Sequence, residues 1–180
     1  MIVRPATSAD APAVGAIYGH HVLTGLGTFE ETPPTDAEMA ERMAGVQGRG
    51  LPYLVAEDAG RVLGFAYAAP FRPRAAYRYT AEDSVYIHPD FVGRGVGKAL
   101  LGEVIAACEA LGLRQLTAVI GDSGNAGSIA LHRSLGFRET GIGRAVGFKF
   151  GRWVDIVWMQ RPLNGGAATV PSGHGLSSGG

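Results

Sequence analysis

The sequence predicts one α/β domain of the α+β type, built around a single mixed but mostly antiparallel sheet. Three observations favour this class: a length that suits one domain, enough apolar residues for a core, and an alternating series of strand and helix patterns. The chain has 180 residues, of which 46% are hydrophobic and 18% are charged. Because no internal repeat divides it, we expect one domain over residues 1–163 and a tail over residues 164–180.

The first half of the chain is predicted to form three strands and two helices. An apolar stripe at helical spacing covers residues 13–22, after an N-cap at Thr7 or Ser8. Thr35 and Glu38 have the spacing of a capping box, which begins the second helix. The turn sequence at residues 58–60 joins two apolar runs into a hairpin. The expected strands are residues 2–5, 53–57 and 61–69, and the second helix covers residues 35–46.

The second half is predicted to alternate between strands and helices after an irregular, basic and aromatic segment at residues 71–79. An apolar stripe with a spacing of three and four residues includes Leu101, Val104 and Cys108. Cys108 is therefore expected as a small buried side chain rather than a reactive thiol. The expected helices are residues 96–111 and 125–135, and the expected strands are residues 84–88, 115–120, 137–148 and 153–161.

The composition excludes several classes of protein. Lys and Arg number 16, as do Asp and Glu, so there is no basic excess for binding nucleic acid or an anionic membrane. The single cysteine excludes an internal disulfide and a cysteine-built metal site, and we expect no other metal site. No apolar run reaches the ~18 residues of a membrane span, and the N-terminus lacks the features of a signal peptide. We therefore expect a cytoplasmic domain.

Glycine is unusually frequent, with 28 residues, about twice the usual ~7%. Six of these lie in residues 165–180, a stretch with no apolar periodicity, which predicts a disordered tail. Most of the others mark turns. The densest cluster is Gly93, Gly95 and Gly97, between a predicted strand and a predicted helix.

This glycine-rich turn is predicted to bind a pyrophosphate. Backbone N–H groups at a helix N-terminus carry partial positive charge, glycines let a phosphate approach them, and Arg94 and Lys98 add cationic side chains. The spacing does not fit a Walker A loop, because three residues rather than four separate Gly93 from Gly97. A dinucleotide fingerprint fails as well, because Leu100 stands where it needs Gly or Ala. A merely flexible connection is the competing interpretation.

Two blocks of the sequence resemble the GNAT acetyltransferases. Residues 85–101, which include the glycine turn, resemble their acyl-CoA-binding signature, and residues 125–137 resemble the motif that follows it. The resemblance implies the GNAT fold, a twisted and mostly antiparallel sheet flanked by about four helices, and acetyl-CoA as cosubstrate. The family pattern normally has Arg or Gln where this chain has Val92. Because backbone amides hold the pyrophosphate, we expect weaker side-chain contacts but retained binding.

Three further blocks resemble the group of phosphinothricin N-acetyltransferases and methionine sulfoximine/sulfone acetyltransferases. They are residues 77–86, 118–121 and 147–155, and the likeness extends over residues 1–163. This resemblance implies transfer of an acetyl group to the α-amino group of a small amino-acid analogue, and a homodimer. Direct transfer in a ternary complex is expected, since no cysteine is placed as an obvious covalent relay.

The resemblance also implies the catalytic groups. Glu82 is expected to take a proton from the amine, directly or through water, although a solvated carboxylate at a strand end is the alternative. A backbone N–H of residues 85–87 is expected to stabilise the oxyanion. His132 stands where many GNAT enzymes have tyrosine, and is expected to protonate the leaving thiolate or to position other groups. A histidine on the helix surface is the competing interpretation.

The cofactor contacts follow from the same blocks. Asn125 is expected to contact the pantetheine arm, or merely to cap the following helix. The residues implied to bind acetyl-CoA are Val85, Tyr86, Ile87, Gly93, Arg94, Gly95, Val96, Gly97, Lys98 and Asn125.

The acceptor is expected to be a small zwitterion with a further polar end. Arginine forks suit a carboxylate or phosphinate oxygen, and Arg72 and Arg74 shortly precede Glu82, although an exposed basic loop is the alternative. Lys149 and Trp153 could complete the pocket from the last hairpin or form the dimer contact. The residues implied to bind the acceptor are Phe29, Glu30, Arg72, Pro73, Arg74, Tyr77 and Lys149.

Two other functions compete with this one. The acceptor could be an aminoglycoside, a polyamine or a protein N-terminus, but Arg72 and Arg74 disfavour a cationic aminoglycoside. Alternatively, the chain could be a non-catalytic acyl-CoA sensor. The presence of Glu82 and His132 speaks against that interpretation.

Overall fold

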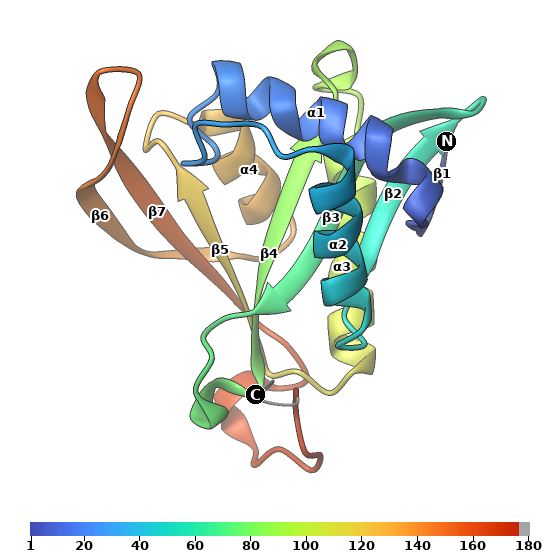
Figure 1. Ribbon diagram of the computed structural model, residues 1–180. Coiled ribbons are helices and arrows are strands. Elements are labelled where there is room, and N and C mark those ends of the chain that lie inside the picture. Colours follow the sequence, from blue (N-terminus) through green and yellow to red (C-terminus); the bar gives the residue numbers. More distant parts are fainter. Residues whose placement is uncertain (177–180) are drawn as a thin grey trace.

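Residues 1–176, which a computed structural model describes, form a seven-stranded sheet with helices on both faces (Figure 1). The strand order is β1-β2-β3-β4-β5-β7-β6, and only β4 and β5 pair in parallel. This confirms the predicted mixed, mostly antiparallel sheet. The strands are β1 (Ile2–Pro5), β2 (Tyr53–Asp58), β3 (Arg61–Pro70), β4 (Thr80–Ile87), β5 (Gln115–Gly121), β6 (Arg138–Lys149) and β7 (Arg152–Pro162). The helices are α1 (Ala11–Thr24), α2 (Asp36–Gln47), α3 (Val96–Ala110) and α4 (Ala126–Ser134), with 3-10 turns η1 (Ser8–Asp10), η2 (Ala75–Tyr77), η3 (Pro89–Phe91) and η4 (Gly166–Ala168).

Each face of the sheet has its own apolar core. α1 and α2 bury Ile17 and Met39 against Phe65 on one face. α3 buries Leu100 and Cys108 on the other face, where α4 also packs. Cys108 is fully buried, as its helical stripe predicted, and burial raises the pKa of its thiol to about 12. The thiol is therefore inert at neutral pH.

Helix capping follows the sequence closely. Thr35 Oγ1 accepts a hydrogen bond from the Glu38 backbone at 3.2 Å, and the Glu38 carboxylate accepts one from the Thr35 backbone at 2.7 Å. The predicted capping box is therefore present, and α2 begins one residue after Thr35. Asn125 caps α4 by accepting a hydrogen bond from the Ser128 backbone at 3.2 Å.

β4 and β5 separate halfway along their length. Residues 80–83 of β4 pair with residues 115–118 of β5, and the pairing ends at Asp83 and Ala118. Figure 1 shows the two strands diverging beyond this point, while β4 stays paired with β3 as far as Ile87. The predicted strand over residues 84–88 therefore starts four residues too late, because Thr80 to Asp83 are held by neighbours on both sides.

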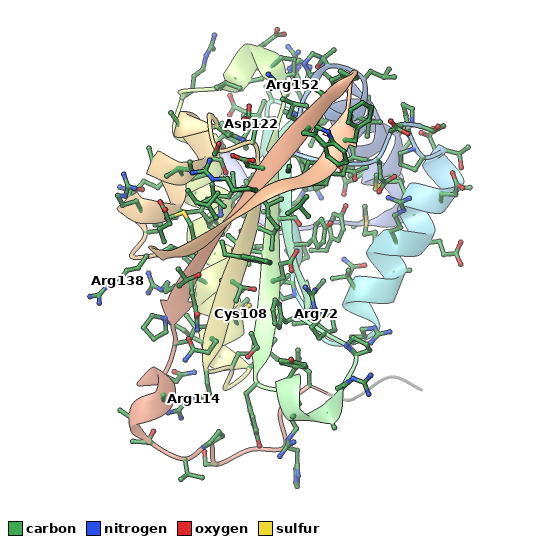
Figure 2. The ribbon with its side chains drawn as sticks, turned by 90° about the vertical axis from the view of Figure 1, so that its left-hand side faces the viewer. Arg72, Cys108, Arg114, Asp122, Arg138 and Arg152 are labelled. Carbon is green, nitrogen blue, oxygen red and sulfur yellow. The ribbon has the colours of Figure 1, made fainter. Side chains whose placement is uncertain are left out.

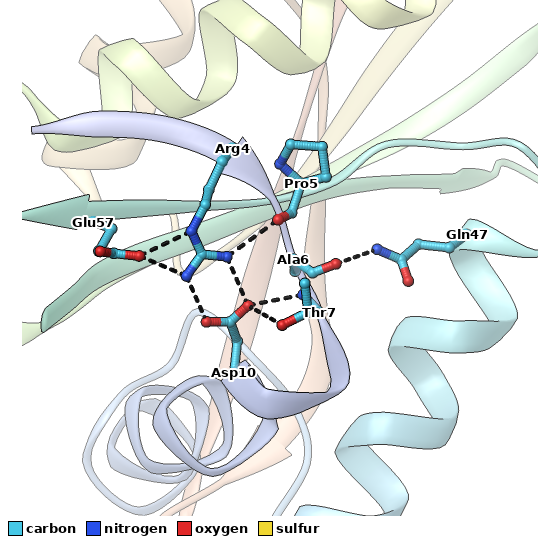
Figure 3. Close-up of polar contacts among 7 residues, drawn as sticks. All are labelled: Arg4, Pro5, Ala6, Thr7, Asp10, Gln47 and Glu57. Carbon is cyan, nitrogen blue, oxygen red and sulfur yellow. Dashed lines mark hydrogen bonds and ion pairs between the residues drawn. The ribbon is translucent and has the colours of Figure 1, made fainter. Parts of the chain in front are cut away.

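An arginine joins the first strand to its neighbours (Figure 3). The Arg4 guanidinium donates two hydrogen bonds of 2.8 Å to the Asp10 carboxylate, and others of 2.8 and 2.6 Å to Glu57 on β2. The Asp10 carboxylate also accepts a hydrogen bond from the Thr7 backbone at 2.8 Å. These donors, Arg4 first, lower the pKa of Asp10 from 3.8 to about 2.

The C-terminal segment returns to the lower end of the sheet in Figure 1. Arg114, labelled in Figure 2, donates hydrogen bonds to the carbonyls of Gly166 and Thr169, at 2.7 and 3.0 Å. The Leu176 backbone donates one to the Arg78 carbonyl at 2.7 Å. The disordered tail expected over residues 164–180 stays a prediction, and residues 177–180 lie outside the described residues. Within residues 1–176, no helix combines the length and apolar character needed to cross a membrane.

Candidate active site

A cavity of about 630 Å³ opens where β4 and β5 diverge, and we call it the splay cavity. The glycine turn forms one part of its wall, and α4 forms another. Asp83, the last residue of β4 that pairs with β5, lies at the point of divergence. The cavity brings together the following predicted residues: Val85, Tyr86, Ile87, Gly93, Gly95, Gly97, Lys98, Asn125 and His132.

The glycine turn has the geometry of an anion-binding helix start. Gly93 and Gly95 have φ angles of 78° and 82°, in the left-handed region that favours glycine, and Gly95 caps α3. A side chain added at either position would extend into open space, so the backbone is accessible from the cavity. The first N–H groups of the 15-residue α3 have no partner within the helix and carry its positive dipole end. The turn therefore fits a pyrophosphate.

Three residues around this turn differ in how they can contribute. The Val96 side chain is buried in the core, so only its backbone N–H can reach a ligand. The Arg94 guanidinium lies over the Phe91 ring, 5.2 Å from its centre. Val92 lines the cavity and is 65% exposed, so an apolar surface stands where a polar side chain is usual in the resembling family.

His132 is buried and forms a pair with Asp83 at the end of the splay cavity. Its Nε2 lies 2.9 Å from Asp83 Oδ2, and its Nδ1 lies 2.8 Å from the Ser128 carbonyl oxygen. Burial disfavours a charged His132, but the hydrogen bond and charge of Asp83 outweigh it and raise the imidazole pKa. With His132 only 2% exposed, the alternative of a histidine on the helix surface is wrong.

Asp83 is the residue of this site that the sequence reasoning missed. Burial raises the pKa of its carboxyl group, although His132 opposes this effect. Side chains alternate between the two faces of a strand, so Asp83 and Glu82 point to opposite faces of the sheet. This alternation could have indicated Asp83, because a strand that directs Glu82 to one face directs the next side chain to the other face.

A second cavity, of about 560 Å³, lies between α2 and β3, and we call it the α2 cavity. Its wall combines aromatic rings with the side chains of Arg42, Arg49 and Arg72. Figure 2 shows Arg72 on the side of the sheet that carries α2. Of the predicted acceptor residues, Arg72 and Pro73 line this cavity.

Glu82 lies on the same face of the sheet as the α2 cavity. It pairs across the ladder with Ala69, which lines the cavity, and cross-strand partners share a face. Burial raises the pKa of Glu82 above 4.5, and the nearby positive charge of Arg72 opposes this rise. A carboxylate with a raised pKa beside a cavity is suited to accept a proton.

The other predicted acceptor residues in the loop after β3 lie at the margin of this cavity. Tyr77 packs edge-on against Phe71, with ring centres 5.5 Å apart, and Phe71 lines the cavity. Arg74 precedes η2, is exposed, and lies outside the cavity wall. Of these residues, Arg72 lines the α2 cavity, whereas Arg74 and Tyr77 do not.

The loop between α1 and α2 is fastened by residues predicted to contact the acceptor. Glu30 accepts hydrogen bonds from Arg42 at 2.7 Å and from the Tyr18 hydroxyl at 2.8 Å. Lys149 is 1% exposed, and its ammonium group donates to the carbonyls of Gly25 and Thr28 at 2.9 and 2.8 Å. Lys149 thus holds the loop and does not line either cavity.

Phe29 in the same loop packs on the last hairpin. Its ring occupies the space that a side chain at Gly147 would need. The loop and β6 are therefore joined by two contacts, one apolar through Phe29 and one polar through Lys149.

Proteins with similar sequences share one type of activity in their names. The Acetyltransferase (GNAT) family matches residues 20–137. The phosphinothricin N-acetyltransferase of Alcaligenes faecalis is 57% identical, over 94% of this chain and 86% of that protein. The L-methionine sulfoximine/L-methionine sulfone acetyltransferase of Pseudomonas paraeruginosa is 43% identical, over 90% of this chain and 94% of its own.

Solved structures show the same similarity in three dimensions. The crystal structure of a GNAT superfamily phosphinothricin acetyltransferase from Sinorhizobium meliloti, in complex with AcCoA, superimposes with a TM-score of 0.92. The two sequences are 51% identical, and the match covers 95% of this chain and 92% of the other.

Proposed function

Because this chain belongs to the acetyltransferase (GNAT) family, we propose that it acetylates the α-amino group of a small amino-acid analogue. It is an N-acetyltransferase that uses acetyl-CoA. Phosphinothricin and methionine sulfoximine or sulfone are the leading acceptors, since similar proteins carry these names. The observation that carries the proposal is the splay cavity, which Asp83 lines, together with the α2 cavity on the face of the sheet to which Glu82 points.

The splay cavity is the proposed site of acetyl-CoA, which supplies an acetyl group activated as a thioester. The backbone N–H groups of the glycine turn would bind its pyrophosphate, and Lys98 would add a positive charge. Asn125 would contact the pantetheine arm in addition to capping α4. Beyond Asp83, β4 is no longer paired with β5, so backbone N–H groups in residues 85–87 that face β5 can stabilise an oxyanion.

The α2 cavity is the proposed acceptor site. Glu82 takes a proton from the ammonium group of the acceptor, which converts it into a nucleophilic amine. Arg72 binds a carboxylate or phosphinate oxygen, and Arg49 adds positive charge to the wall, whereas the charge of Arg42 is paired with Glu30. A cationic aminoglycoside or polyamine would be repelled by such a wall, so this lining favours an anionic acceptor.

Direct transfer is the proposed chemical route. Cys108 is buried, with a pKa near 12, and cannot serve as an acetyl carrier at neutral pH. The amine therefore attacks the thioester carbon in a ternary complex, while Glu30, Phe29 and Lys149 fix the loop beside the acceptor. Initial-rate lines for the two substrates should intersect; parallel lines would indicate a covalent acetyl-enzyme.

We propose that the enzyme is cytoplasmic and acts as a homodimer. Phe148 and Trp153 face each other across the last hairpin, with ring centres 5.2 Å apart, and both are more than half exposed. Val146 and Phe150 beside them are also exposed. Such a group of large apolar side chains is typical of a surface that is covered by a partner.

A panel of acceptor amines tests the proposed substrate class. Thiol release from acetyl-CoA should be fastest with phosphinothricin or methionine sulfoximine, and slow with an aminoglycoside, a polyamine or a peptide N-terminus. Turnover of an aminoglycoside together with no turnover of either amino-acid analogue would contradict the acceptor assignment. No turnover of any amine, with acetyl-CoA still bound, would favour a sensor.

A further inference from the structure

Asp83 and His132 form a buried pair whose hydrogen bonds fix how many protons it holds. A carbonyl oxygen can only accept, so the His132 Nδ1 must donate its proton to the Ser128 carbonyl, 2.8 Å away. The 2.9 Å contact between Nε2 and Asp83 Oδ2 then requires one more proton between these two atoms. Without it, a lone pair on Nε2 would face a carboxylate oxygen. The geometry thus requires one shared proton.

The pair joins α4 to β4 but leaves one oxygen of Asp83 without a partner. The Asp83 side chain is 1% exposed, and among residues 1–176 nothing offers a hydrogen-bond partner to its Oδ1. A buried carboxylate oxygen without a partner destabilises the native state, so it calls for an explanation other than stability. Both residues line the splay cavity, from which a partner can approach.

The Asp83–His132 pair and Glu82 lie on opposite sides of β4. Glu82 points to the face with the α2 cavity, and Asp83 points to the face with the splay cavity. An amine deprotonated on one face and a thiolate released on the other would place the two proton transfers on opposite sides of the same strand. Glu82 lies on the side of the first transfer, and Asp83 lies on the side of the second.

We propose that Asp83 is a positioning residue that acts through His132, and that the pair holds the single proton delivered to the departing thiolate. The inference rests on the proposed function. When the carbon–sulfur bond breaks, its electron pair remains on sulfur, and the sulfur, on the side of the splay cavity, takes the proton shared between His132 Nε2 and Asp83 Oδ2. The proton on Nδ1 stays in place. The pair, now one proton short, recovers it from solvent, while the acceptor nitrogen releases its own proton through Glu82.

The titratable groups around the pair do not compete for this proton. On α3, the Cys108 thiol has a pKa near 12, raised by burial and by the charge of Asp83. On β4, the charge of Asp83 contributes to the raised pKa of Glu82, but Glu82 lies on the other face of the sheet. Next to β6, the rings of His132 and Phe137 pack in a T-shaped arrangement, with ring centres 5.0 Å apart. The Phe137 ring carries no charge. Asp83 is the group whose hydrogen bond and charge raise the pKa of His132.

Nuclear magnetic resonance of ¹⁵N-histidine-labelled protein tests the pair without any substrate. The chain has 5 histidines, and the signals lost in His132→Gln assign His132. At pH 8, both ring nitrogens of His132 should carry a proton, although an unperturbed imidazole is neutral above pH ~6.5. In Asp83→Asn, only Nδ1 should remain protonated, with the titration midpoint lowered by more than about two pH units.

Asp10→Asn is the matched control, because Asp10 is another buried, ion-paired carboxylate, bound to Arg4 beside β1 and outside the wall of the splay cavity. It should leave the His132 signals unchanged. In Asp83→Asn, turnover at pH 8 should fall at least tenfold and recover towards pH 6.5, a recovery that a purely structural defect would not show.

Two results would overturn the inference: a wild-type His132 that titrates near pH 6.5, or an Asp83→Asn protein whose His132 keeps both protons at pH 8. If Asp83→Asn does not fold, the wild-type titration alone decides. If His132 carries both protons at pH 8 but the protein acetylates no amine, the proposed function is contradicted. The number of protons on the Asp83–His132 pair is then still as inferred.

Discussion

In the proposed reaction, two adjacent carboxylates on β4 divide the chemistry between the faces of the sheet. Glu82 is beside a cavity lined by arginines, whereas Asp83 is bound to His132 in the cavity that contains the glycine turn. Burial raises the pKa of both carboxyl groups, but only Glu82 has a neighbouring arginine that opposes the rise. Glu82 is therefore the one suited to lose and regain a proton as a free base.

Glu82→Gln should reduce kcat at least ~100-fold, because the amide cannot accept the proton of the ammonium group. Acetyl-CoA affinity should stay within about twofold, since Glu82 lies on the opposite face from the glycine turn. The wild-type enzyme should lose activity as Glu82 is protonated, at a pH above 4.5, because burial raises its pKa. Stopped-flow kinetics across pH and calorimetric titration with acetyl-CoA measure these quantities; unchanged turnover in the variant removes Glu82 as the base.

Sequence reasoning found the residue types at the site but not all their partners. The block containing Glu82 and the histidine motif identified Glu82 and His132, but not Asp83. Asp83 was overlooked because its role depends on contact with His132, which is 49 residues away in the chain. Lys149 was assigned to the acceptor for the same reason, since its bonds to the loop carbonyls arise only in the folded state.

At the scale of elements, the last hairpin acts as a support for the loop between α1 and α2. Phe29 and Lys149 join the two segments, and Gly147 leaves the space that the Phe29 ring fills. Because Glu30 in this loop is bound to Arg42 of the α2 cavity, the hairpin is also connected to the wall of that cavity. The loop therefore depends on a glycine for its position.

Gly147→Ala should displace Phe29 and destabilise the protein by about 1–3 kcal/mol, the usual cost of overpacking. The acceptor KM should rise while acetyl-CoA affinity is retained. Gly141→Ala is the control, because it lies on the same strand and an added side chain would meet open space. Urea denaturation and steady-state kinetics compare the two variants; equal stability and equal KM would mean that the loop does not depend on this contact.

Most elements could be predicted because their signals are local. Apolar stripes, the Thr35 capping box and the turn at residues 58–60 each act within a few residues, and the structure contains all of them. The start of β4 was misplaced because Thr80, Glu82 and Asp83 are polar and do not have the composition of a strand. They are extended because β3 and β5 bind their backbones on both sides, which is tertiary information.

For the whole molecule, the ion pairs of Arg4 join β1, β2 and the start of α1 (Figure 3). The pKa of Asp10 falls from 3.8 to about 2 on folding, chiefly through its hydrogen bonds with Arg4. A depressed carboxyl pKa contributes stability that is present above pH 4 and disappears as the pH falls towards 2. At ~1.4 kcal/mol per pKa unit, this contribution is on the order of 2 kcal/mol.

Asp10→Asn should therefore lower the free energy of unfolding by on the order of 2 kcal/mol at pH 7. The difference from wild type should shrink between pH 4 and pH 2, because protonated Asp10 no longer binds Arg4 as an anion. Asp90→Asn is the control, since its ion pair with Arg61 is exposed and worth under ~1 kcal/mol. Urea denaturation at several pH values tests this; a difference independent of pH would contradict the assignment to ionisation.

The proposed reaction depends on where the two cavities lie relative to β4. A sequence can indicate a glycine turn and a base, but the face of the sheet on which each side chain lies follows from the register of β3, β4 and β5. A crystal structure of the protein with both CoA and phosphinothricin measures this arrangement directly. We predict the acceptor nitrogen within ~3.2 Å of Glu82, or one water away, and the CoA sulfur on the side of Asp83 and His132. An acceptor nitrogen bound on the Asp83 side, with no contact to Glu82, would contradict the account.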